Sequence, residues 1–353
     1  MYHCLSDKIA ETLRRELADG RYGPGRSFPS VDALRQRFGA GEYAVRHALQ
    51  RLRKEGLVIH RQRTGTVPTP RAFCVFKGRV ALVCTGKGGD FFRNALAIQL
   101  ALRFREAGWD FVSVYLPISE DGEPDLGALR AIASNGLAFA IFLAFETKVS
   151  AVFDGFGIPY VVLNGYARDF PNARAVIRED FRACFAELIG ALRARNVKTL
   201  HEFDFEREMD RGFRRQLADA GIALSSTRYE MKSMRGWTIA DVRRSGHWMV
   251  GKFFADRQHR ENPPDAILFD DDYLASGGLI AIFEAGLRVP QDIGVIFYSN
   301  TGNEPALGVE STRIENDPVS YGDTVAAYVL KLLDGRRAVP PRISWRFIRG
   351  ASL

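Results

Sequence analysis

The residues with the clearest chemical potential lie on one predicted helix near the N-terminus. In the segment 42–55, Val45 and Leu49 belong to an apolar stripe, so the polar side chains between them face the opposite side. A helix fits the major groove of DNA, where each base pair presents a distinguishable pattern of donors and acceptors. The polar face is therefore expected to contact bases. Its candidate residues are Glu42, Tyr43, Arg46 and His47.

A second basic group follows, at the tip of a predicted hairpin. Short strands at 57–59 and 64–67 flank the tip, where a glycine lets the backbone approach another surface closely. Such a tip can lie along the minor groove. Its candidate residues are Arg61, Arg63, Thr64 and Gly65, and the arginines expected to meet phosphates are Arg35, Arg37, Arg51 and Arg53.

The charge of the chain is concentrated in this region. Residues 1–71 hold 14 basic and 7 acidic residues, whereas the remaining residues hold 35 of each sign. The excess of +7 in the first segment therefore equals the net charge of the whole chain. A compact basic unit joined to a neutral one is the electrostatic pattern of a nucleic-acid-binding module.

Helix signals place these residues in a small domain. Residues 6–19 read as a helix, and Ser30 is a good N-cap for a second helix that ends before the turn at 39–41. The helix 42–55 follows and is terminated by Gly56. Three helices followed by a hairpin predict a winged helix-turn-helix domain over residues 1–67. Residues 68–77 are expected to be a linker.

The pattern changes after the linker. Continuous apolar runs occur at 80–83, 111–115, 138–143, 160–163, 266–269 and 293–297, and helical segments separate them. Strands that are apolar throughout and alternate with helices predict parallel sheets covered on both faces. The expected fold class is therefore α/β, with residues 78–353 forming the larger domain.

The N-terminal domain resembles the GntR winged-helix family. The resemblance rests on Gly23-Pro24-Gly25-Arg26-Ser27-Phe28-Pro29-Ser30, Leu34, Arg37-Phe38-Gly39, Val45-Arg46-His47-Ala48-Leu49, Leu52-Arg53-Lys54-Glu55-Gly56-Leu57-Val58 and Gly65-Thr66. It implies that Ser30, Arg46, His47, Arg61 and Gly65 face DNA. Two positions that are commonly arginine in the family are acids here, Asp32 and Glu42. An acid repels phosphates, although it can accept a hydrogen bond from cytosine, so the usual family operator is not expected.

The larger domain is similar to the effector domain of LacI/GalR regulators, which resembles periplasmic sugar-binding proteins. The similarity is strongest over 264–297 and includes Arg211-Gly212-Phe213, Gly157-Ile158-Pro159 and Asn316-Asp317-Pro318. It implies two α/β lobes with a ligand between them, at the carboxyl ends of parallel strands. A GntR domain joined to such a body resembles the arabinose-repressor-like branch.

The resemblance also implies which residues contact the effector. By position they are Asp90, Phe91, Asn164, Met209, Asp271, Ser299 and Asn316. The relatives commonly carry Arg, Asn and Asp at the positions of Met209, Asp271 and Ser299. Losing that arginine and aspartate removes charge-assisted hydrogen bonds to a sugar. The family likeness implies a sugar or a related metabolite as effector, whereas these departures indicate that the effector is not a simple sugar or that the pocket is degenerate and the domain acts without a ligand.

One pattern suggests an enzyme. Asp270 and Asp272 follow an apolar strand with D-x-D spacing, which resembles the magnesium-dependent haloacid-dehalogenase-type phosphatases. Those enzymes place the motif near the start of the domain, whereas here it lies about 190 residues into it. The glycine-rich loop 85–90 matches neither phosphate-binding signature. No catalytic residue, metal site or cofactor is therefore expected.

The remaining features favour a cytoplasmic regulator. The N-terminal residues contain early acids and no apolar stretch of the kind that a signal peptide needs, and no run reaches the length of a membrane span. Cys84 and Cys184 lie in apolar patterns and are expected to be buried. The sequence as a whole predicts a homodimer that binds a pseudo-palindromic operator, with repression relieved by a small effector as the direction that family likeness favours.

Overall fold

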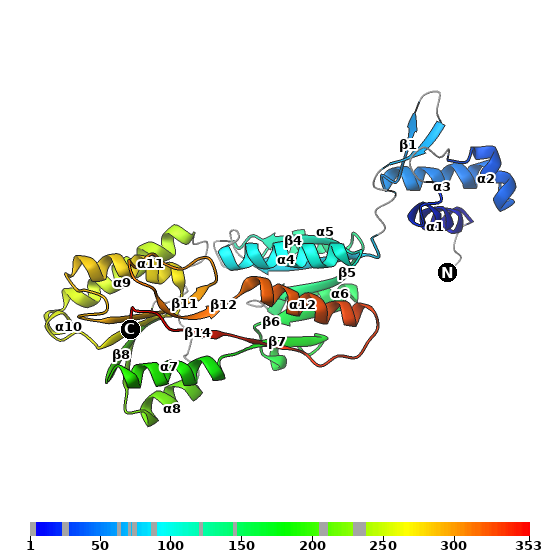
Figure 1. Ribbon diagram of the computed structural model, residues 1–353. Coiled ribbons are helices and arrows are strands. Elements are labelled where there is room, and N and C mark those ends of the chain that lie inside the picture. The colour runs from blue at the N-terminus through cyan, green and yellow to red at the C-terminus, as the bar shows by residue number, and fades with distance from the viewer. Residues whose placement is uncertain are drawn as a thin grey trace. The chain divides into compact units, whose positions relative to one another are not determined.

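The computed structural model describes residues 5–22, 28–61, 65–69, 72, 76–85, 90–119, 123–143, 147–204, 211–228 and 238–353. The chain divides into two compact units, residues 1–77 with 108–110, and residues 78–107 with 111–353 (Figure 1). Each unit is described by itself. Within the described ranges, every helix is too short or too polar to cross a bilayer.

The smaller unit contains three helices and a two-stranded sheet. The helices are α1 (Leu5–Ala18), α2 (Val31–Phe38) and α3 (Glu42–Lys54), and the antiparallel strands are β1 (Val58–Arg61) and β2 (Gly65–Pro68). Leu13, Leu34, Leu49 and Leu52 are fully or almost fully buried in its core. This arrangement confirms the winged helix-turn-helix predicted from the sequence, with element boundaries shifted by one or two residues.

Local signals set the ends of these helices. The Ser30 hydroxyl accepts a hydrogen bond from the Ala33 N–H at 3.2 Å, which confirms the predicted N-cap of α2. Gly39 ends the same helix with φ of 56°, a left-handed conformation that glycine adopts without strain. The guanidinium of Arg14 on α1 forms two hydrogen bonds with Glu55, at 3.0 and 2.7 Å, and so joins α1 to the end of α3.

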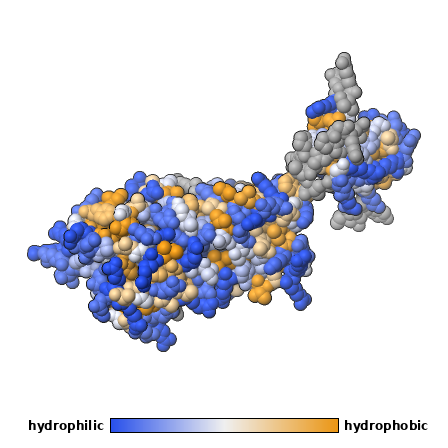
Figure 2. Space-filling view, viewed as in Figure 1, coloured by the Kyte–Doolittle hydropathy of each residue, from blue (hydrophilic) through white to orange (hydrophobic). Residues whose placement is uncertain are grey.

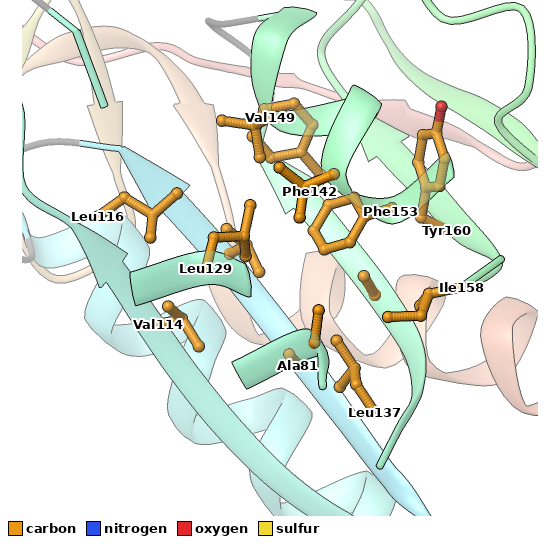
Figure 3. Packing of buried hydrophobic residues seen from close by; sticks show 14 of the residues in the cluster. Ala81, Val114, Leu116, Leu129, Leu137, Phe142, Val149, Phe153, Ile158 and Tyr160 are labelled. Carbon is orange, nitrogen blue, oxygen red and sulfur yellow. The ribbon is translucent and has the colours of Figure 1, made fainter. Parts of the chain in front are cut away.

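Lobe 1 of the larger unit is built on a six-stranded sheet in the order β13-β7-β6-β5-β3-β4. The strands are β3 (Arg79–Thr85), β4 (Asp110–Leu116), β5 (Leu137–Leu143), β6 (Tyr160–Leu163), β7 (Ala175–Asp180) and β13 (Arg342–Ser344). The sheet is accompanied by α4 (Phe91–Glu106), α5 (Leu126–Ala133), α6 (Thr147–Phe156), the short 3-10 helix η2 (Ala167–Asp169) and α12 (Pro318–Leu333). Side chains of α5 and α6 pack on one face of the sheet, around Phe142 and Phe153 (Figure 3).

Lobe 2 has a second six-stranded sheet, in the order β14-β12-β11-β10-β8-β9, and only β14 is antiparallel to its neighbour. The strands are β8 (Thr199–Asp204), β9 (Ala223–Arg228), β10 (Ala266–Phe269), β11 (Gly294–Asn300), β12 (Thr312–Asn316) and β14 (Arg346–Ile348). The helices are α7 (Arg182–Ala194), α8 (Arg211–Asp219), α9 (Ile239–Ala255), α10 (Arg257–Glu261) and α11 (Asp272–Glu284). Helices α7 and α8 cover one face and α9 and α11 the other, which confirms the predicted doubly covered sheet.

Three segments connect the lobes. The chain leaves lobe 1 at Phe181, between β7 and α7, and returns at Asp317, between β12 and α12. It crosses again at Trp345, between β13 and β14. The rings of Phe181 and Trp345 lie 5.2 Å apart, so two of the crossovers contact each other.

Helices α9 and α11 cross at glycines. A Cβ atom built on Gly277 would lie 1.8 Å from the carbonyl oxygen of Arg243, and one on Gly246 would lie 2.1 Å from that of Leu274. The two backbones can approach this closely only because both residues lack a side chain.

We predict that Gly277→Ala lowers the free energy of unfolding of the protein. The added methyl group forces the helices apart, and overpacking of this kind costs about 1–3 kcal/mol or more. Urea unfolding followed by circular dichroism measures the loss. Gly251→Ala is the matched control, because its Cβ would lie 4.0 Å from the nearest atom, Cβ of Ala281. That variant should gain stability by up to about 1 kcal/mol, and an equal loss in both would contradict the interpretation.

Candidate functional site

The exposed face of α3 carries the four residues predicted from its helical pattern. Val45 and Leu49 are buried, whereas Glu42, Tyr43, Arg46 and His47 are exposed. Tyr43 is 83% exposed, which is unusual for a large aromatic side chain, and its ring stacks on that of His47 at 6.1 Å. This face therefore presents a charged row beside an aromatic row, both open to a partner.

Acids on this surface are paired with arginines one turn further along. Nε of Arg46 donates to Oε1 of Glu42 at 2.7 Å, and Nη1 of Arg35 lies 3.3 Å from Oδ1 of Asp32. The hydrogen bond with Arg46 is the main cause that lowers the pKa of Glu42, and Arg35 contributes through its charge. Glu42 is therefore ionised at neutral pH.

The other basic residues of the small unit differ in whether they are already paired within the protein. Arg37 and Arg51 form ion pairs with Glu16 and Asp7 of α1, so these arginines hold the helices together. Arg53 donates to the Thr66 hydroxyl of β2 at 3.4 Å. Arg61 and Gly65 stand opposite each other at the ends of β1 and β2. The predicted tip residues Arg63 and Thr64 lie outside the described residues.

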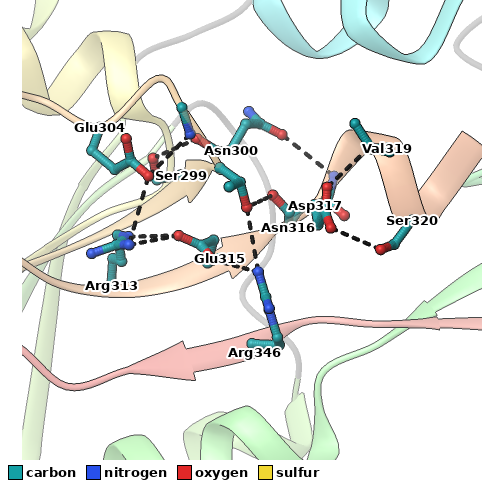
Figure 4. A network of polar contacts seen from close by, with 12 residues as sticks. Ser299, Asn300, Glu304, Arg313, Glu315, Asn316, Asp317, Val319, Ser320 and Arg346 are labelled. Carbon is teal, nitrogen blue, oxygen red and sulfur yellow. Dashed lines mark hydrogen bonds and ion pairs between the residues drawn. The ribbon is translucent and has the colours of Figure 1, made fainter. Parts of the chain in front are cut away.

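In lobe 2, three of the predicted effector residues follow neighbouring strands. Asp271 caps α11, where its Oδ1 accepts the Leu274 N–H at 2.9 Å. Ser299 and Asn316, at the ends of β11 and β12, are 1% and 2% exposed. Nδ2 of Asn316 donates to Oδ1 of Asn300 at 3.4 Å (Figure 4). The three residues therefore lie at one edge of the sheet, as their positions after parallel strands require. Met209 lies outside the described residues.

In lobe 1, the corresponding edge carries the other three predicted residues. Asp90 caps α4 and accepts the Arg93 N–H at 2.8 Å, and Phe91 begins the helix. Asn164 follows β6 with φ of 58°, a left-handed conformation. Its amide donates to Glu179 at 3.0 Å, and its Oδ1 accepts from the hydroxyl of Tyr321 at 3.3 Å.

Two tyrosines that the sequence analysis did not select join these residues. The hydroxyl of Tyr273, on α11 of lobe 2, accepts the N–H of Phe91, on α4 of lobe 1, at 2.9 Å. Tyr321 packs edge-on against Phe92 at 5.3 Å. The bond between Phe91 and Tyr273 therefore brings the lobe-1 and lobe-2 groups together. A tyrosine two residues after Asp271 was the available sequence signal, since its hydroxyl can reach across a gap.

A pocket of about 150 Å³ lies beside two of the crossovers. It is lined by Asn316, Asp317, Ser320, Tyr321, Thr324, Arg342, Ile343, Ser344 and Arg346. One wall is held by a polar network, in which the buried Glu315 accepts hydrogen bonds from Arg313 at 2.8 Å and from Arg346 at 2.6 Å (Figure 4). The pocket is polar and adjoins one predicted effector residue, Asn316.

Lobe 2 carries a group of carboxyl groups close to this edge. Burial, reinforced by Asp272 and Asp270, raises the pKa of Asp271. Burial, together with Asp204 and Asp270, raises the pKa of Glu202 to about 8. Asp204 is fully buried and pairs with Arg228 at 3.2 Å. Protonated carboxyl groups can donate hydrogen bonds, so this region offers donors as well as acceptors at neutral pH.

Asp272, the second acid of the D-x-D pair, has a structural role. Asp272 is 2% exposed, and its Oδ2 accepts both the backbone N–H and the side-chain amide of Asn300 at 3.3 Å. Across the described residues, no three His, Cys, Asp or Glu side chains are grouped in a way that could hold a metal ion. Asp272 is thus engaged by Asn300 within lobe 2.

The contribution of Glu202 to stability is predicted to fall as pH rises between about 5 and 8. Glu202 loses its proton near its ordinary pKa of 4.5 in the unfolded chain but only near 8 in the folded protein. The contribution of Glu202 to the free energy of unfolding therefore decreases as pH rises from its unfolded pKa to about 8, and is constant above that pH. Glu202→Gln removes this contribution and should flatten the fall by about 4 kcal/mol, since one pKa unit corresponds to about 1.4 kcal/mol.

The measurement is urea unfolding at pH values from about 5 to 8. Glu187→Gln, at an exposed position of α7, is the matched control and should leave the pH dependence unchanged. A Glu202→Gln protein with the wild-type pH profile would show that this carboxyl group does not titrate abnormally.

Comparisons with known proteins match both units. Residues 5–67 match the model of bacterial regulatory proteins of the gntR family, and residues 188–353 match a periplasmic binding protein-like domain. The HTH-type transcriptional repressor PurR of Yersinia enterocolitica is 29% identical over 133 residues, which are 37% of this chain and 36% of that protein. PurR of Yersinia pestis strain Pestoides F is 36% identical over 87 residues, a quarter of each chain. The chain thus aligns with about a quarter to a third of the length of these curated relatives.

Solved structures match the larger unit. A LacI family transcriptional regulator from Bifidobacterium animalis subsp. lactis has a TM-score of 0.62 at 18% identity, covering 78% of this chain and 97% of its own. One from Arthrobacter sp. FB24, in complex with lactose, has a TM-score of 0.61 at 19% identity, with 78% and 98% coverage. The Lac repressor dimer bound to operator has a TM-score of 0.62 at 17% identity, with 78% and 93% coverage. These matches show the fold. The chain therefore joins a winged helix-turn-helix domain that matches the gntR family model to a two-lobed domain with the fold of LacI family regulators, of which residues 188–353 match a periplasmic binding protein-like domain.

Proposed function

We propose that the protein is a transcription regulator that binds double-stranded operator DNA through the small unit and changes its operator affinity when a small effector binds between the lobes. The observation that carries the proposal is the exposed face of α3, with Tyr43, Arg46 and His47, on a basic unit joined to a ligand-binding fold. The gntR-family and PurR matches support the DNA-binding half, and they favour repression.

The small unit has the geometry that groove binding needs. Helix α3 follows α2 after a short turn, as the recognition helix does in helix-turn-helix domains. Its buried stripe rests on α1 and α2, which leaves the polar face for bases. Ser30, Arg35 and Arg61 are proposed to approach the DNA backbone, and the wing tip with Arg63, Thr64 and Gly65 is proposed to lie along the minor groove.

The larger unit supports effector binding between its lobes. Asp90, Phe91 and Asn164 of lobe 1 and Asp271, Ser299 and Asn316 of lobe 2 are polar or aromatic groups of the type that bind sugars and related metabolites, and Met209 is assigned to the same site. The neighbour from Arthrobacter was solved with lactose, which supports a ligand of this class. The separation into residues 1–67, a linker at 68–77 and residues 78–353 then lets closure of the lobes act on the DNA-binding units. A ligand can do so only through different affinities for the two states.

Homodimerisation is proposed through exposed apolar side chains of the larger unit. Ile98 and Leu102 on α4, Trp248 on α9, and Ile280 and Phe283 on α11 are all exposed. Figure 2 shows apolar residues gathered over α9 and α11. The Lac repressor neighbour is a dimer bound to operator, and pairing of two chains doubles the DNA contacts through effective concentration. DNA as the target places the protein in the cytoplasm.

Duplex binding is expected to depend on Arg46 and Arg61. At low ionic strength the protein should retain duplexes from a randomised pool. Arg46→Ala and Arg61→Ala should each weaken binding to the selected duplex by about tenfold, and Arg61→Ala should lower the slope of log affinity against log salt by about 1. Arg15→Ala is the control, because it removes one exposed charge from α1 and should change affinity much less. Absence of binding to any duplex at low ionic strength would disprove the proposal.

A second candidate is a regulator whose body no longer binds a ligand. The bond between Phe91 and Tyr273 favours it, because the protein's own groups already join the two lobes. The two candidates differ in a melting-temperature screen against a metabolite library. A ligand at a hundred times its dissociation constant stabilises a protein by about 2.7 kcal/mol.

The effector proposal predicts that at least one metabolite raises the melting temperature of the wild type. The shift should be lost in Asn316→Ala while the variant without ligand still folds. If no metabolite produces a shift and DNA binding persists, the body acts without a ligand.

A further inference from the structure

The exposed face of α3, which is proposed to approach DNA, carries an acidic residue, Glu42. A negative charge is unfavourable close to the phosphates of DNA. Glu42 is the first residue of the helix and Arg46 lies one turn later, and both side chains are at least half exposed. If the proposed function is correct, the first turns of this helix enter the major groove, which phosphates border on both sides. A carboxylate there repels phosphates, so its presence needs a compensating role.

The geometry of the pair suggests that role. Oε1 of Glu42 holds Nε of Arg46 at 2.7 Å, and the structure gives Nη1 and Nη2 of Arg46 no partner among the described residues. A guanidinium held through Nε keeps its two Nη atoms available to a partner as a planar fork. Such a fork matches the O6 and N7 acceptors of guanine, the commonest specific contact in protein–DNA complexes. A free arginine, by contrast, has many rotamers and can turn toward a phosphate.

The surroundings keep the carboxylate in place and ionised. Arg46 and Arg35 both lower the pKa of Glu42, and Asp32 in turn binds Arg35 at 3.3 Å. The next side chains on the exposed face, Tyr43 and His47, stack on each other and not on Arg46. The guanidinium of Arg46 is therefore held by Glu42 and takes no part in this ring contact.

We infer that Glu42 is a positioning residue that fixes the Arg46 fork for one guanine in each operator half-site and lowers the affinity of the protein for non-specific DNA. The inference rests on the proposed function and assigns to it a feature of its DNA ligand. Glu42 raises selectivity in two ways, by ordering Arg46 and by repelling phosphates where no guanine is present. The departure from arginine at this position is then a specificity device.

The test uses the full-length protein and a pool of duplexes with a randomised stretch of roughly 30 base pairs, long enough for two half-sites spaced by one or two helical turns. Wild type is expected to enrich a guanine at one fixed position in each half-site. Arg46→Lys should lose that preference, because an ammonium group lacks the fork. Glu42→Ala should reduce the preference for guanine over adenine at that position by about tenfold, while affinity for an unrelated duplex rises. Glu42→Gln should retain much of the preference, because an amide oxygen still accepts from Nε.

Glu11→Gln is the matched control. Glu11 forms a similar exposed ion pair with Arg15, at 3.5 Å on α1, so this variant changes the charge of the same unit by the same amount. It should leave the selected guanine unchanged. Circular dichroism establishes that each variant is folded before selection.

The outcomes separate the two proposals. If Glu42→Ala keeps the wild-type guanine preference, Glu42 does not position Arg46 and the inference is wrong. If Glu42→Ala loses affinity for all duplexes as severely as Arg46→Ala, the carboxylate contacts DNA directly, which also overturns the inference. If the wild type enriches no sequence and binds no duplex, the proposed function itself fails.

Discussion

Neither lobe of the larger unit can be completed without chain that has first passed through the other. Along the chain, α12 and β13 of lobe 1 follow all but one strand of lobe 2. The last strand, β14, then pairs with β12 in lobe 2. The chain therefore passes between the lobes three times, at Phe181, Asp317 and Trp345. This topology places the carboxyl ends of both sheets beside the crossovers, which is where Asn164, Asp271 and Asn316 lie. Any relative motion of the lobes must be absorbed by these few residues, as in hinge-type closure.

The sequence predicts best the elements whose burial leaves a simple pattern. Apolar runs predicted β3, β5, β6, β10 and β11, because parallel strands covered on both faces must be apolar throughout. Strands β7, β8 and β12 were not predicted. They carry the acidic residues Glu179, Glu202 and Glu315, which interrupt the apolar pattern and are paired with side chains outside their own strands, so no continuous apolar run marks these strands. The glycines at the crossing of α9 and α11 were not predicted either. The need for a small residue at each position arises only from the other helix, which lies about thirty residues away in the sequence.

The candidate site was predictable in its parts but not in its connections. Positions after strands located Asp90, Asn164, Ser299 and Asn316 at the edges of the sheets. The link between the two edges is a tyrosine hydroxyl on one helix and a backbone N–H on another, 182 residues apart. Similarly, the sequence marks Glu42 as a departure from the family that the small unit resembles, but only the structure shows that Glu42 is paired with a nearby arginine. Pairwise contacts of this kind depend on side-chain direction, which helical periodicity does not specify.

The strength of the contact between lobes bears on how an effector could act. A neutral hydrogen bond such as that between Phe91 and Tyr273 contributes about 1 kcal/mol net, because both groups can bond to water when the lobes separate. A metabolite with a millimolar dissociation constant binds with about 4 kcal/mol. Such a ligand can therefore replace this bond and still shift the balance between open and closed lobes. The carboxyl group of Asp271 contributes as well, because desolvation and the charges of Asp272 and Asp270 raise its pKa. Under the proposed function, a ligand that donates a hydrogen bond to Asp271 or carries positive charge would be favoured over one that does not.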